Sequence, residues 1–204
     1  MKKFELTSET KINIFGKKLF RIKALISFAD VEAGETGGWV EKEGNVNQSG
    51  NAWVYGNAEV YGNAEVSGDA KVYGNAKVSG NAWVSDNAKV YGNTKVSGNA
   101  EVYGNAEVSG DAWVYGNAKV YGNAEVSGDA EVYGNADYTT IHGFGTQFRT
   151  TTFFRCKDKK VRVACGCFFG TIPEFREQVK NTRKGKIAEE YLMIADLMEN
   201  HFEK

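Results

Sequence analysis

The sequence lacks any apolar run long enough to cross a membrane. A spanning helix needs about 20 consecutive apolar residues, whereas Gly, Asn and charged residues interrupt this chain throughout. Residues 1–5 turn polar at once and provide no apolar signal-peptide core. These absences predict a soluble protein that stays in the cytoplasm and does not associate with membranes.

Cysteine and histidine are also scarce. The three cysteines are Cys156, Cys165 and Cys167, an odd count that fits a reducing compartment better than a disulfide framework. Cys-x-Cys is not the usual spacing of a zinc knuckle. Strand alternation places Cys165 and Cys167 on the same face as Val161 and Val163, which favours small core residues. We therefore expect no metal site and no cofactor.

Charge is divided unevenly along the chain. Residues 45–137 carry five Lys and Arg against eleven Asp and Glu, whereas residues 138–204 carry twelve against eight. The middle is therefore acidic and the tail basic. Such a split can indicate an acidic partner for the tail, or simply two different solvated surfaces.

A six-residue repeat dominates the middle of the chain. Valine recurs at every sixth position from Val54 to Val132, fourteen times without a miss. Alanine follows its own six-residue spacing from Ala52 to Ala136, broken only by Thr94. The unit reads Ala-x-Val-Tyr/Ser-Gly-Asn/Asp, with Gly replaced once, at Asp86.

This spacing predicts short parallel strands wound into a three-sided coil. Alternation puts Ala and Val on one face of each strand, and Gly-Asn or Gly-Asp supplies the corner, because both residue types tolerate left-handed backbone dihedrals. A helix is excluded, since a Gly every sixth residue would cost about 1 kcal/mol each. Three strands per turn give an 18-residue coil, and about five coils give a rod about 24 Å long.

An 18-residue coil also predicts which exposed side chains stack. Tyr55, Tyr73 and Tyr91 fall on one face. Within the repeat, tryptophan recurs every thirty residues, at Trp53, Trp83 and Trp113. Thirty residues are one and two-thirds coils, so these three side chains fall on three different faces. A shared tryptophan platform for a sugar or a base is not expected.

Different modules are predicted at the two ends. Residues 1–45 should form a β cap, residues 46–137 the β-helix, and residues 138–204 a hairpin followed by two helices. The hairpin is predicted from residues 150–155 and 161–165. Thr171-Ile172-Pro173-Glu174 is a capping box that begins one helix, and the apolar stripe of residues 187–202 indicates a second. This ββαα tail would either cap the rod or stand as a separate head.

The repeat resembles the left-handed β-helix hexapeptide family, in which an aliphatic residue is followed four positions later by a small one, as Val54 is by Ala58. The resemblance implies left-handed coiling. It also implies a trimeric acyl- or acetyltransferase as one function, since many members are such enzymes. Their chemistry usually needs a histidine base, and His142 and His201 both lie outside the coils.

A second resemblance rests on Phe28-Ala29-Asp30-Val31-Glu32-Ala33-Gly34, on Gly37-Gly38-Trp39-Val40 and on Cys165-Gly166-Cys167-Phe168-Phe169-Gly170-Thr171. These segments are similar to bacterial and prophage-encoded repeat proteins. The resemblance implies a phage gene that acts on the host cell, for example against an antiviral defence.

The candidate binding residues are the basic and aromatic side chains of the tail. Basic residues interleaved with aromatics can grip a nucleotide or a nucleic-acid backbone, although a solvated surface would carry similar charges. The acidic rod argues against DNA bound along its length and against sequence-specific DNA recognition. The candidates are Arg149, Phe153, Phe154, Arg155, Lys159, Lys160, Arg162, Arg176, Lys180, Arg183, Lys184 and Lys186.

Taken together, the sequence favours a non-enzymatic phage or prophage scaffold or binding protein. In this interpretation the rod is a rigid spacer, and the tail binds or sequesters a host protein or a nucleotide signal in the host cytoplasm. The alternatives are a trimeric acyltransferase and a virion structural element. A homo-oligomer, either a dimer or a trimer, is compatible with each interpretation.

Overall fold

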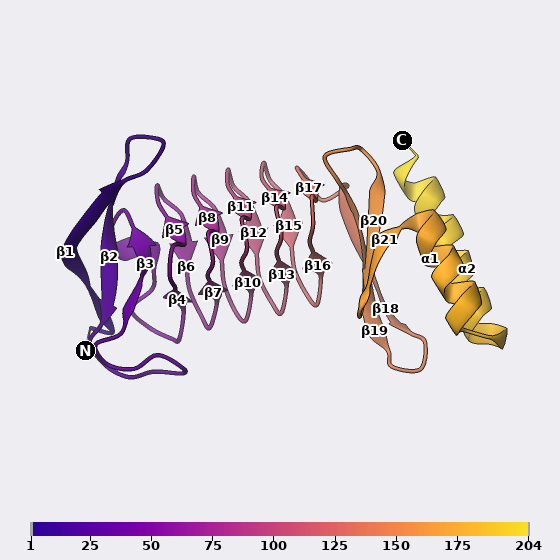
Figure 1. Cartoon of the computed structure of the whole chain (residues 1–204), viewed down its shortest axis with the longest axis horizontal. Helices are drawn as coiled ribbons and strands as arrows, with labels where there is room; N and C mark the ends of the chain where they lie inside the picture. The colour runs from indigo at the N-terminus through magenta and orange to yellow at the C-terminus, as the bar shows by residue number, and fades with distance from the viewer. Residues whose placement is uncertain (1, 204) are drawn as a thin grey trace.

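A computed structural model describes residues 2–203, with the repeat region lying between two end segments along one long axis (Figure 1). The repeat consists of short strands of two residues each. They are β4 (Trp53–Val54), β5 (Glu59–Val60), β6 (Glu65–Val66), β7 (Lys71–Val72), β8 (Lys77–Val78), β9 (Trp83–Val84), β10 (Lys89–Val90), β11 (Lys95–Val96), β12 (Glu101–Val102), β13 (Glu107–Val108), β14 (Trp113–Val114), β15 (Lys119–Val120), β16 (Glu125–Val126) and β17 (Glu131–Val132).

Every third strand pairs in parallel, so the 18-residue coil is confirmed. Val90 pairs with Val72 on one side and with Val108 on the other. Three sheets result, in the orders β1-β2-β3-β5-β8-β11-β14-β17, β16-β13-β10-β7-β4 and β15-β12-β9-β6. The chain is therefore mainly β, with a parallel β-solenoid of about five turns.

The interior of the solenoid is a prism of stacked Ala and Val. Val54 to Val132 are all fully buried, and burying a side chain of this size contributes roughly 1.5–3 kcal/mol. Thr94 replaces one alanine without leaving a polar group unsatisfied, because its hydroxyl donates a hydrogen bond to the carbonyl of Tyr91 at 2.5 Å.

The corners differ from the sequence prediction in one respect. Gly carries the left-handed conformation, with φ of 69° at Gly116, and Asp86 takes it with φ of 57° where Gly is absent. The Asn that follows Gly has no positive φ, so its predicted left-handed role is wrong. These Asn side chains instead form ladders, in which Asn81 donates to Asn99 and Asn99 to Asn117, each at 3.0 Å.

Three longer strands extend one face of the solenoid at the N-terminal end. The strands are β1 (Phe4–Ile12), β2 (Lys18–Ala24) and β3 (Thr36–Val40), and a 3₁₀ helix follows at Glu43–Asn45. β1 and β2 are antiparallel, as are β2 and β3, whereas β3 is parallel to β5. Coiling therefore begins before the perfect repeats, as predicted.

The register of this first coil differs from that of the later coils. Val40 pairs with Val60, and Val46 with Val66. Both pairs are 20 residues apart, two more than in later coils. Val40 and Val46 therefore belong to the valine columns, although they lie 12 and 6 residues before Ala52 in the sequence.

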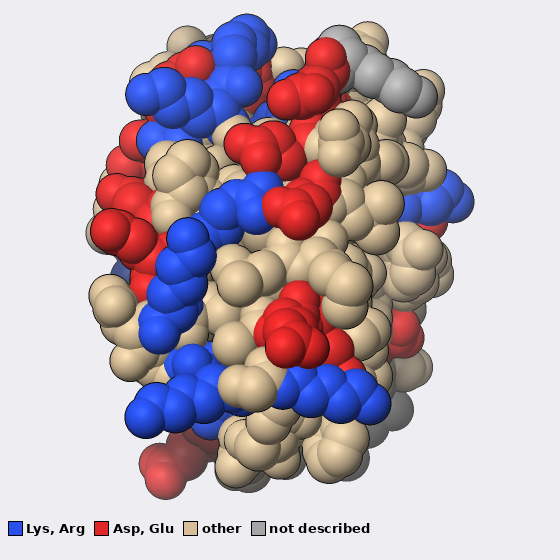
Figure 2. Space-filling view, turned by 90° about the vertical axis from the view of Figure 1, so that its right-hand side faces the viewer, with Lys and Arg blue, Asp and Glu red and all other residues tan. Residues whose placement is uncertain are grey.

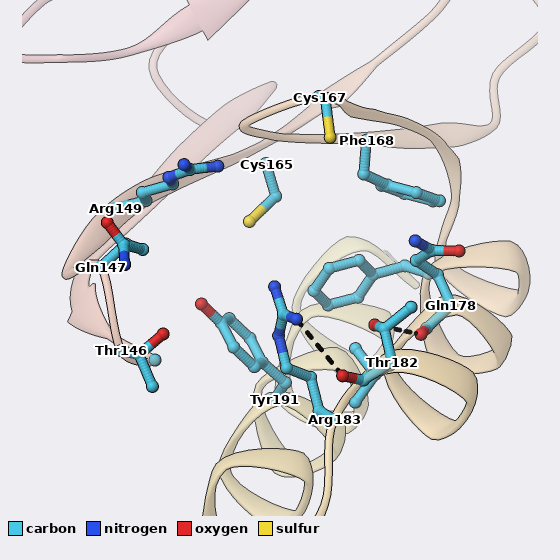
Figure 3. A pocket seen from close by; sticks show the side chains of 13 residues that line it. Thr146, Gln147, Arg149, Cys165, Cys167, Phe168, Gln178, Thr182, Arg183 and Tyr191 are labelled. Atoms are coloured by element: carbon cyan, nitrogen blue, oxygen red, sulfur yellow. Dashed lines mark hydrogen bonds between the residues drawn. The ribbon is translucent and has the colours of Figure 1, made fainter.

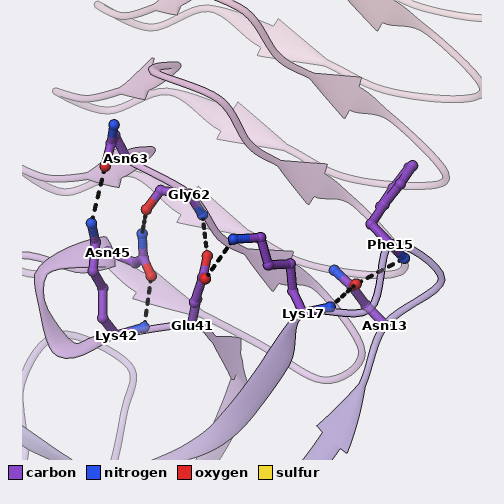
Figure 4. A network of polar contacts seen from close by, with 8 residues as sticks. All are labelled: Asn13, Phe15, Lys17, Glu41, Lys42, Asn45, Gly62 and Asn63. Carbon is purple, nitrogen blue, oxygen red and sulfur yellow. Dashed lines mark hydrogen bonds and ion pairs between the residues drawn. The ribbon is translucent and has the colours of Figure 1, made fainter.

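Side chains satisfy the backbone groups exposed at this end of the rod (Figure 4). The Asn45 amide donates to the carbonyls of Gly62 and Ala64, at 3.2 and 2.8 Å. A Glu41 carboxylate oxygen accepts from the Gly62 N–H at 2.6 Å, and the other carboxylate oxygen pairs with Lys17. Because open strand edges template aggregation, these contacts protect the first coil.

The N-terminal segment also covers one of the three tryptophans that are spaced by thirty residues. Trp53 is fully buried, with its ring 5.9 Å from that of Phe4 and 5.4 Å from that of Phe28. The tryptophans do lie in three different sheets, as predicted. Trp53 is not exposed, however, because the loop carrying Phe28 folds over it.

The C-terminal module contains four antiparallel strands where the sequence predicted two. They are β18 (Tyr138–Phe144), β19 (Arg149–Arg155), β20 (Val161–Cys165) and β21 (Phe168–Thr171), in that spatial order. The predicted hairpin is the β19–β20 pair. Two helices follow, α1 (Ile172–Thr182) and α2 (Gly185–Phe202), and α1 begins at the predicted Thr171–Glu174 capping box.

This antiparallel sheet lies between the rod and the two helices (Figure 1). Its rod-facing side chains, Phe154 and Cys156 among them, join the core of the solenoid. Those on the opposite face, such as Phe153 and Val163, pack with α1 and α2. The module therefore caps the rod and is not a separate head.

The apolar stripe predicted for the second helix is partly correct. Tyr191, Ala195 and Met198 are buried against the sheet and α1, whereas Leu197 is 59 % exposed. Within residues 2–203, no helix has the length and apolar character needed to traverse a bilayer.

Candidate functional site: a cavity in the C-terminal module

A cavity of about 130 Å³ opens where the antiparallel sheet meets the two helices (Figure 3). We call it the C-terminal cavity. Its walls come from the β18–β19 loop, the β20–β21 turn, the end of α1 and the middle of α2. The lining residues are Gly145, Thr146, Gln147, Arg149, Cys165, Cys167, Phe168, Phe175, Gln178, Val179, Thr182, Arg183 and Tyr191.

Two glycines allow the loops to approach the cavity closely. Gly145 has φ of 71°, and a Cβ at this position would overlap the Tyr191 hydroxyl. Gly166 has φ of 60°, and a Cβ there would overlap the Arg149 guanidinium. Any other residue at either position would need a left-handed backbone and would push aside a polar group of the cavity.

The charge of the cavity is positive. Its lining contains two arginines, Arg149 and Arg183, and no carboxylate. Within residues 2–203 neither guanidinium forms an ion pair, and the one hydrogen bond of the Arg183 side chain goes to the Thr182 carbonyl at 3.3 Å. In Figure 3 the Arg183 guanidinium extends into the middle of the cavity, whereas the Arg149 guanidinium lies along its edge and points towards Cys165.

Tyr191 lies between these arginines on the α2 wall. Its hydroxyl donates to the carbonyl of Phe144 at 3.2 Å. Burial raises the pKa of this phenol, whereas the positive charges of Arg183 and Arg149 act in the opposite direction. Tyr191 is therefore a neutral hydrogen-bonding group at neutral pH.

Cys165 and Cys167 line the cavity, so the expectation that these two are small core residues needs correction. Cys156 is buried beneath the sheet, and burial raises the pKa of its thiol to about 11. Cys165 is half-buried, and its sulfur accepts a hydrogen bond from the Thr151 hydroxyl at 3.1 Å. Cys167 is exposed because it lies in the β20–β21 turn rather than on a strand.

The two aromatic candidates from the sequence are not available to a ligand. Phe153 and Phe154 are both fully buried, on opposite faces of β19. Consecutive apolar residues are typical of a strand covered on both faces. Their proposed role in binding is therefore corrected to one in packing.

Three of the candidate arginines form contacts within the protein. Arg155 donates to the carbonyl of Phe202 at 2.8 Å and lies over its ring. Arg162 pairs with Asp158 at 2.7 Å, and Arg176 pairs with both Asp196 and Glu199. These arginines hold the module together, so they are not free surface charges as the sequence suggested.

The candidate lysines are spread over the surface and do not line the cavity. Lys159 pairs with Glu131 at 3.4 Å, and Lys186 lies 3.8 Å from Glu190. In the described chain, Lys160, Lys180 and Lys184 have no carboxylate partner. Figure 2 shows the helical end of the molecule, where basic and acidic side chains alternate without a uniformly basic face.

The structure thus brings together two of the predicted residues, Arg149 and Arg183, and adds groups that sequence reasoning missed. Tyr191 was interpreted only as part of an apolar stripe, and Thr182 and Gln178 were not considered. The available signals were the Cys165-Gly166-Cys167 turn and the glycines at 143 and 145, which mark loops that approach a neighbour. His142 is exposed on β18, with Nδ1 3.1 Å from the Thr150 hydroxyl, and does not line the cavity.

Comparison with known proteins agrees with the architecture. The family model described as YdcK Beta solenoid repeat matches residues 70–86, about one coil of the rod. A search of curated proteins found no match. The matched segment and the parallel register of the surrounding strands identify the chain as a repeat β-solenoid protein.

Proposed function

We propose that this chain is a non-enzymatic binding protein, in which the solenoid is a rigid spacer and the C-terminal module makes the functional contact. The observation that carries the proposal is the C-terminal cavity, which Arg149 and Arg183 line without forming an ion pair in the described chain. Charged side chains that line a concave site without an ion pair are typical of ligand recognition.

The outer surface of the rod supports a spacer role. Its side chains contact each other from coil to coil. The ring centroids of Tyr73 and Tyr91 are 4.7 Å apart, and Lys89 Nζ lies 2.7 Å from a carboxylate oxygen of Glu107. The chemistry also changes along each face, since Trp53, Lys71, Lys89, Glu107 and Glu125 occupy successive outward positions of one sheet. Along this face an extended ligand would meet two lysines and then two glutamates, so no single chemistry continues over more than two coils.

The partner we propose is a host protein or a nucleotide-type ligand in a bacterial cell. The resemblance to prophage-encoded repeat proteins supports a phage origin. A phage protein that binds and sequesters such a component would inhibit an antiviral defence of the host. Because the cavity is small, it would hold one charged group of the partner, while the surrounding surface contacts the rest.

The test is affinity capture of proteins and nucleotides from a bacterial extract, using the whole chain. Because the module caps the rod, point variants are preferable to truncation, which would uncover the solenoid core at Val126 and Val132. Reversing the charge of both cavity arginines, Arg149→Glu with Arg183→Glu, should abolish capture of the wild-type partner.

Lys160→Glu is the matched control, since Lys160 does not line the cavity. It should capture the same partner as the wild type, and circular dichroism should show that both variants are folded. Equal capture by the double variant and the wild type would place the contact elsewhere and contradict the proposal.

A further inference from the structure

We infer that the C-terminal cavity binds a phosphoryl group carried by a small organic ligand. The inference rests on the proposed function and deepens it, because it assigns a chemical class to the group that the cavity holds. It is drawn from the charge, the size and the hydrogen-bonding groups of the cavity.

The charge of the cavity matches a doubly negative group. Arg149 and Arg183 contribute two permanent positive charges from different elements, β19 and the end of α1, and no lining residue is acidic. A guanidinium presents a planar fork of donors that fits phosphate oxygens in a bidentate manner. Two such groups on separate walls can hold different oxygens of one phosphoryl group and neutralise its two charges.

The floor of the cavity is apolar, whereas its charged groups face solvent. Phe175 and Val179 are buried beneath it, and Tyr191 is 7 % exposed. Arg149 and Arg183 are both exposed, so salt screens their attraction to an anion and binding should be strongest at low ionic strength. The hydroxyls of Tyr191 and Thr182 already donate to the carbonyls of Phe144 and Gln178, at 3.2 and 2.7 Å, so the charged donors of the cavity are the two guanidiniums.

The size of the cavity limits what enters it. Pockets that enclose a complete small-molecule ligand measure about 300–1,000 Å³, whereas this cavity has about 130 Å³. A phosphoryl head group fits such a volume, and the remainder of the ligand would lie outside, across the exposed Gln147 and Cys167 at the rim. The cavity therefore binds the phosphoryl head group and does not enclose the whole ligand.

The experiment is isothermal titration calorimetry of the whole chain at low ionic strength. The probes are inorganic phosphate, a nucleoside 5′-monophosphate and a phosphoserine peptide, with acetate as the carboxylate comparison. The proteins are the wild type, Arg149→Gln, Arg183→Gln and the control Lys160→Gln, which removes a surface cation that does not line the cavity. A thermal melt of each protein shows that the variants are folded.

We expect saturable one-site binding of at least one phosphorylated probe, weakened tenfold or more by either cavity substitution and unchanged by Lys160→Gln. The nucleoside monophosphate, which is a small organic ligand, should bind more tightly than the phosphoserine peptide, and the reverse order would overturn the inference. Absence of saturable binding, equal weakening by Lys160→Gln, or acetate binding as tight as phosphate would overturn the inference. If no probe binds but Arg149→Glu with Arg183→Glu still abolishes partner capture, the inference fails while the proposed function stands.

Discussion

The solenoid and the C-terminal module bury their apolar residues in opposite ways. In the solenoid each side chain packs against its equivalent one coil away, as Val90 does against Val72 and Val108. In the module one sheet is covered on two different faces, with Phe154 against the rod and Phe153 against the helices. The first arrangement repeats one solution, whereas the second requires side chains that fit two unlike neighbours.

This difference extends to the polar groups. In the rod, equivalent side chains lie one above another. The Asn side chains of a ladder therefore hydrogen-bond from coil to coil, and each stacked Tyr ring packs on another Tyr ring. The module has no such repetition, and Arg149 and Arg183 are left facing a cavity without an acidic partner. Regular repetition therefore yields a stable surface whose polar side chains bind one another. A site with polar groups available to a ligand forms where the repetition ends.

The largest effect is expected from placing a charge inside the rod. Val90 is fully buried, so Val90→Asp would bury a carboxylate with no partner, which costs several kcal/mol. We expect the variant to be unfolded or insoluble, as measured by circular dichroism and by soluble yield. Lys89→Ser, at the adjacent outward position, should fold normally. A soluble, cooperatively folded Val90→Asp protein would show that the inward face is wrongly assigned.

The next largest effect should appear at the junction between the two regions. Phe154→Ala removes a fully buried ring from the interface between the sheet and the rod, which typically costs about 3–5 kcal/mol. Chemical denaturation should measure this loss. Phe169→Ala removes a half-exposed ring on β21 and should lower the free energy of unfolding far less. Equal costs for the two substitutions would mean that the sheet does not seal the rod.

Stacking within the rod can be separated from backbone strain at its corners. Gly98 and Gly122 both have φ of 70°, but a Cβ at Gly98 would meet the backbone of Gly116 at 3.0 Å, whereas nothing lies within 4 Å at Gly122. Left-handed strain alone costs roughly 1–2 kcal/mol. Gly122→Ala should lose about that much on thermal unfolding, and Gly98→Ala distinctly more. Similar losses at both positions would show that contact between neighbouring corners contributes little.

Alkaline pH should affect the two ends of the rod in opposite directions. Burial raises the pKa of Cys156, under the C-terminal sheet, from 9.0 to about 11. Between pH 9 and 11 the folded state therefore keeps the Cys156 proton that the unfolded chain loses. The contribution of Cys156 to the free energy of unfolding is complete below pH 9 and falls as the pH rises towards 11. Burial lowers the pKa of Lys3, at the N-terminal end, from 10.5 to about 8, so stability should rise there between pH 8 and 10.5.

Hydrogen exchange measured at pH 8 and at pH 9.5 would resolve this contrast. Protection should decrease around β19 and increase around β1. Cys156→Val should remove the first change, of on the order of 1–2 kcal/mol, and Lys3→Met the second. A decrease of the same size at both ends, unaffected by either substitution, would contradict the assignment of these two groups.

The repeat could be predicted from sequence because one pattern recurs throughout it. Alternation of Ala and Val, with Gly at each corner, determines the inward face, the 18-residue coil and the tyrosine stacks without knowledge of distant segments. What failed within the rod depended on such segments. Trp53 is buried only because Phe4 and Phe28 fold over it, and its repeat position gives no sign of this.

The C-terminal module was predicted less completely, for physical reasons that differ from strand to strand. The capping box at Thr171 is a local signal, and α1 begins there as expected. β18 was missed because residues 138–144 mix Thr, His and Gly with only a few apolar residues. Phe153 and Phe154 were interpreted as binding residues because the two layers that cover them come from the rod and from the helices.

The cavity itself lies beyond what local patterns indicate. Arg149 and Arg183 are 34 residues apart in sequence, and Tyr191 faces them only because α2 packs against β18 and α1. The predicted cationic cluster was therefore too broad. Five of its ten cations form ion pairs in the folded module. Of the other five, tertiary packing places only Arg149 and Arg183 in the cavity.

The most direct test of the central claim is to shorten the rod and measure what the chain still captures. Residues 84–101 form one 18-residue coil in the middle of the rod. Deleting this coil joins Trp83 to Val102 and preserves the six-residue pattern. If the rod is a spacer, the shortened protein should fold and capture the same partner from a bacterial extract as the wild type, whereas Arg149→Glu with Arg183→Glu should capture none. A folded, shortened protein that loses the partner, beside a charge-reversed protein that keeps it, would place the function on the faces of the rod and contradict the account.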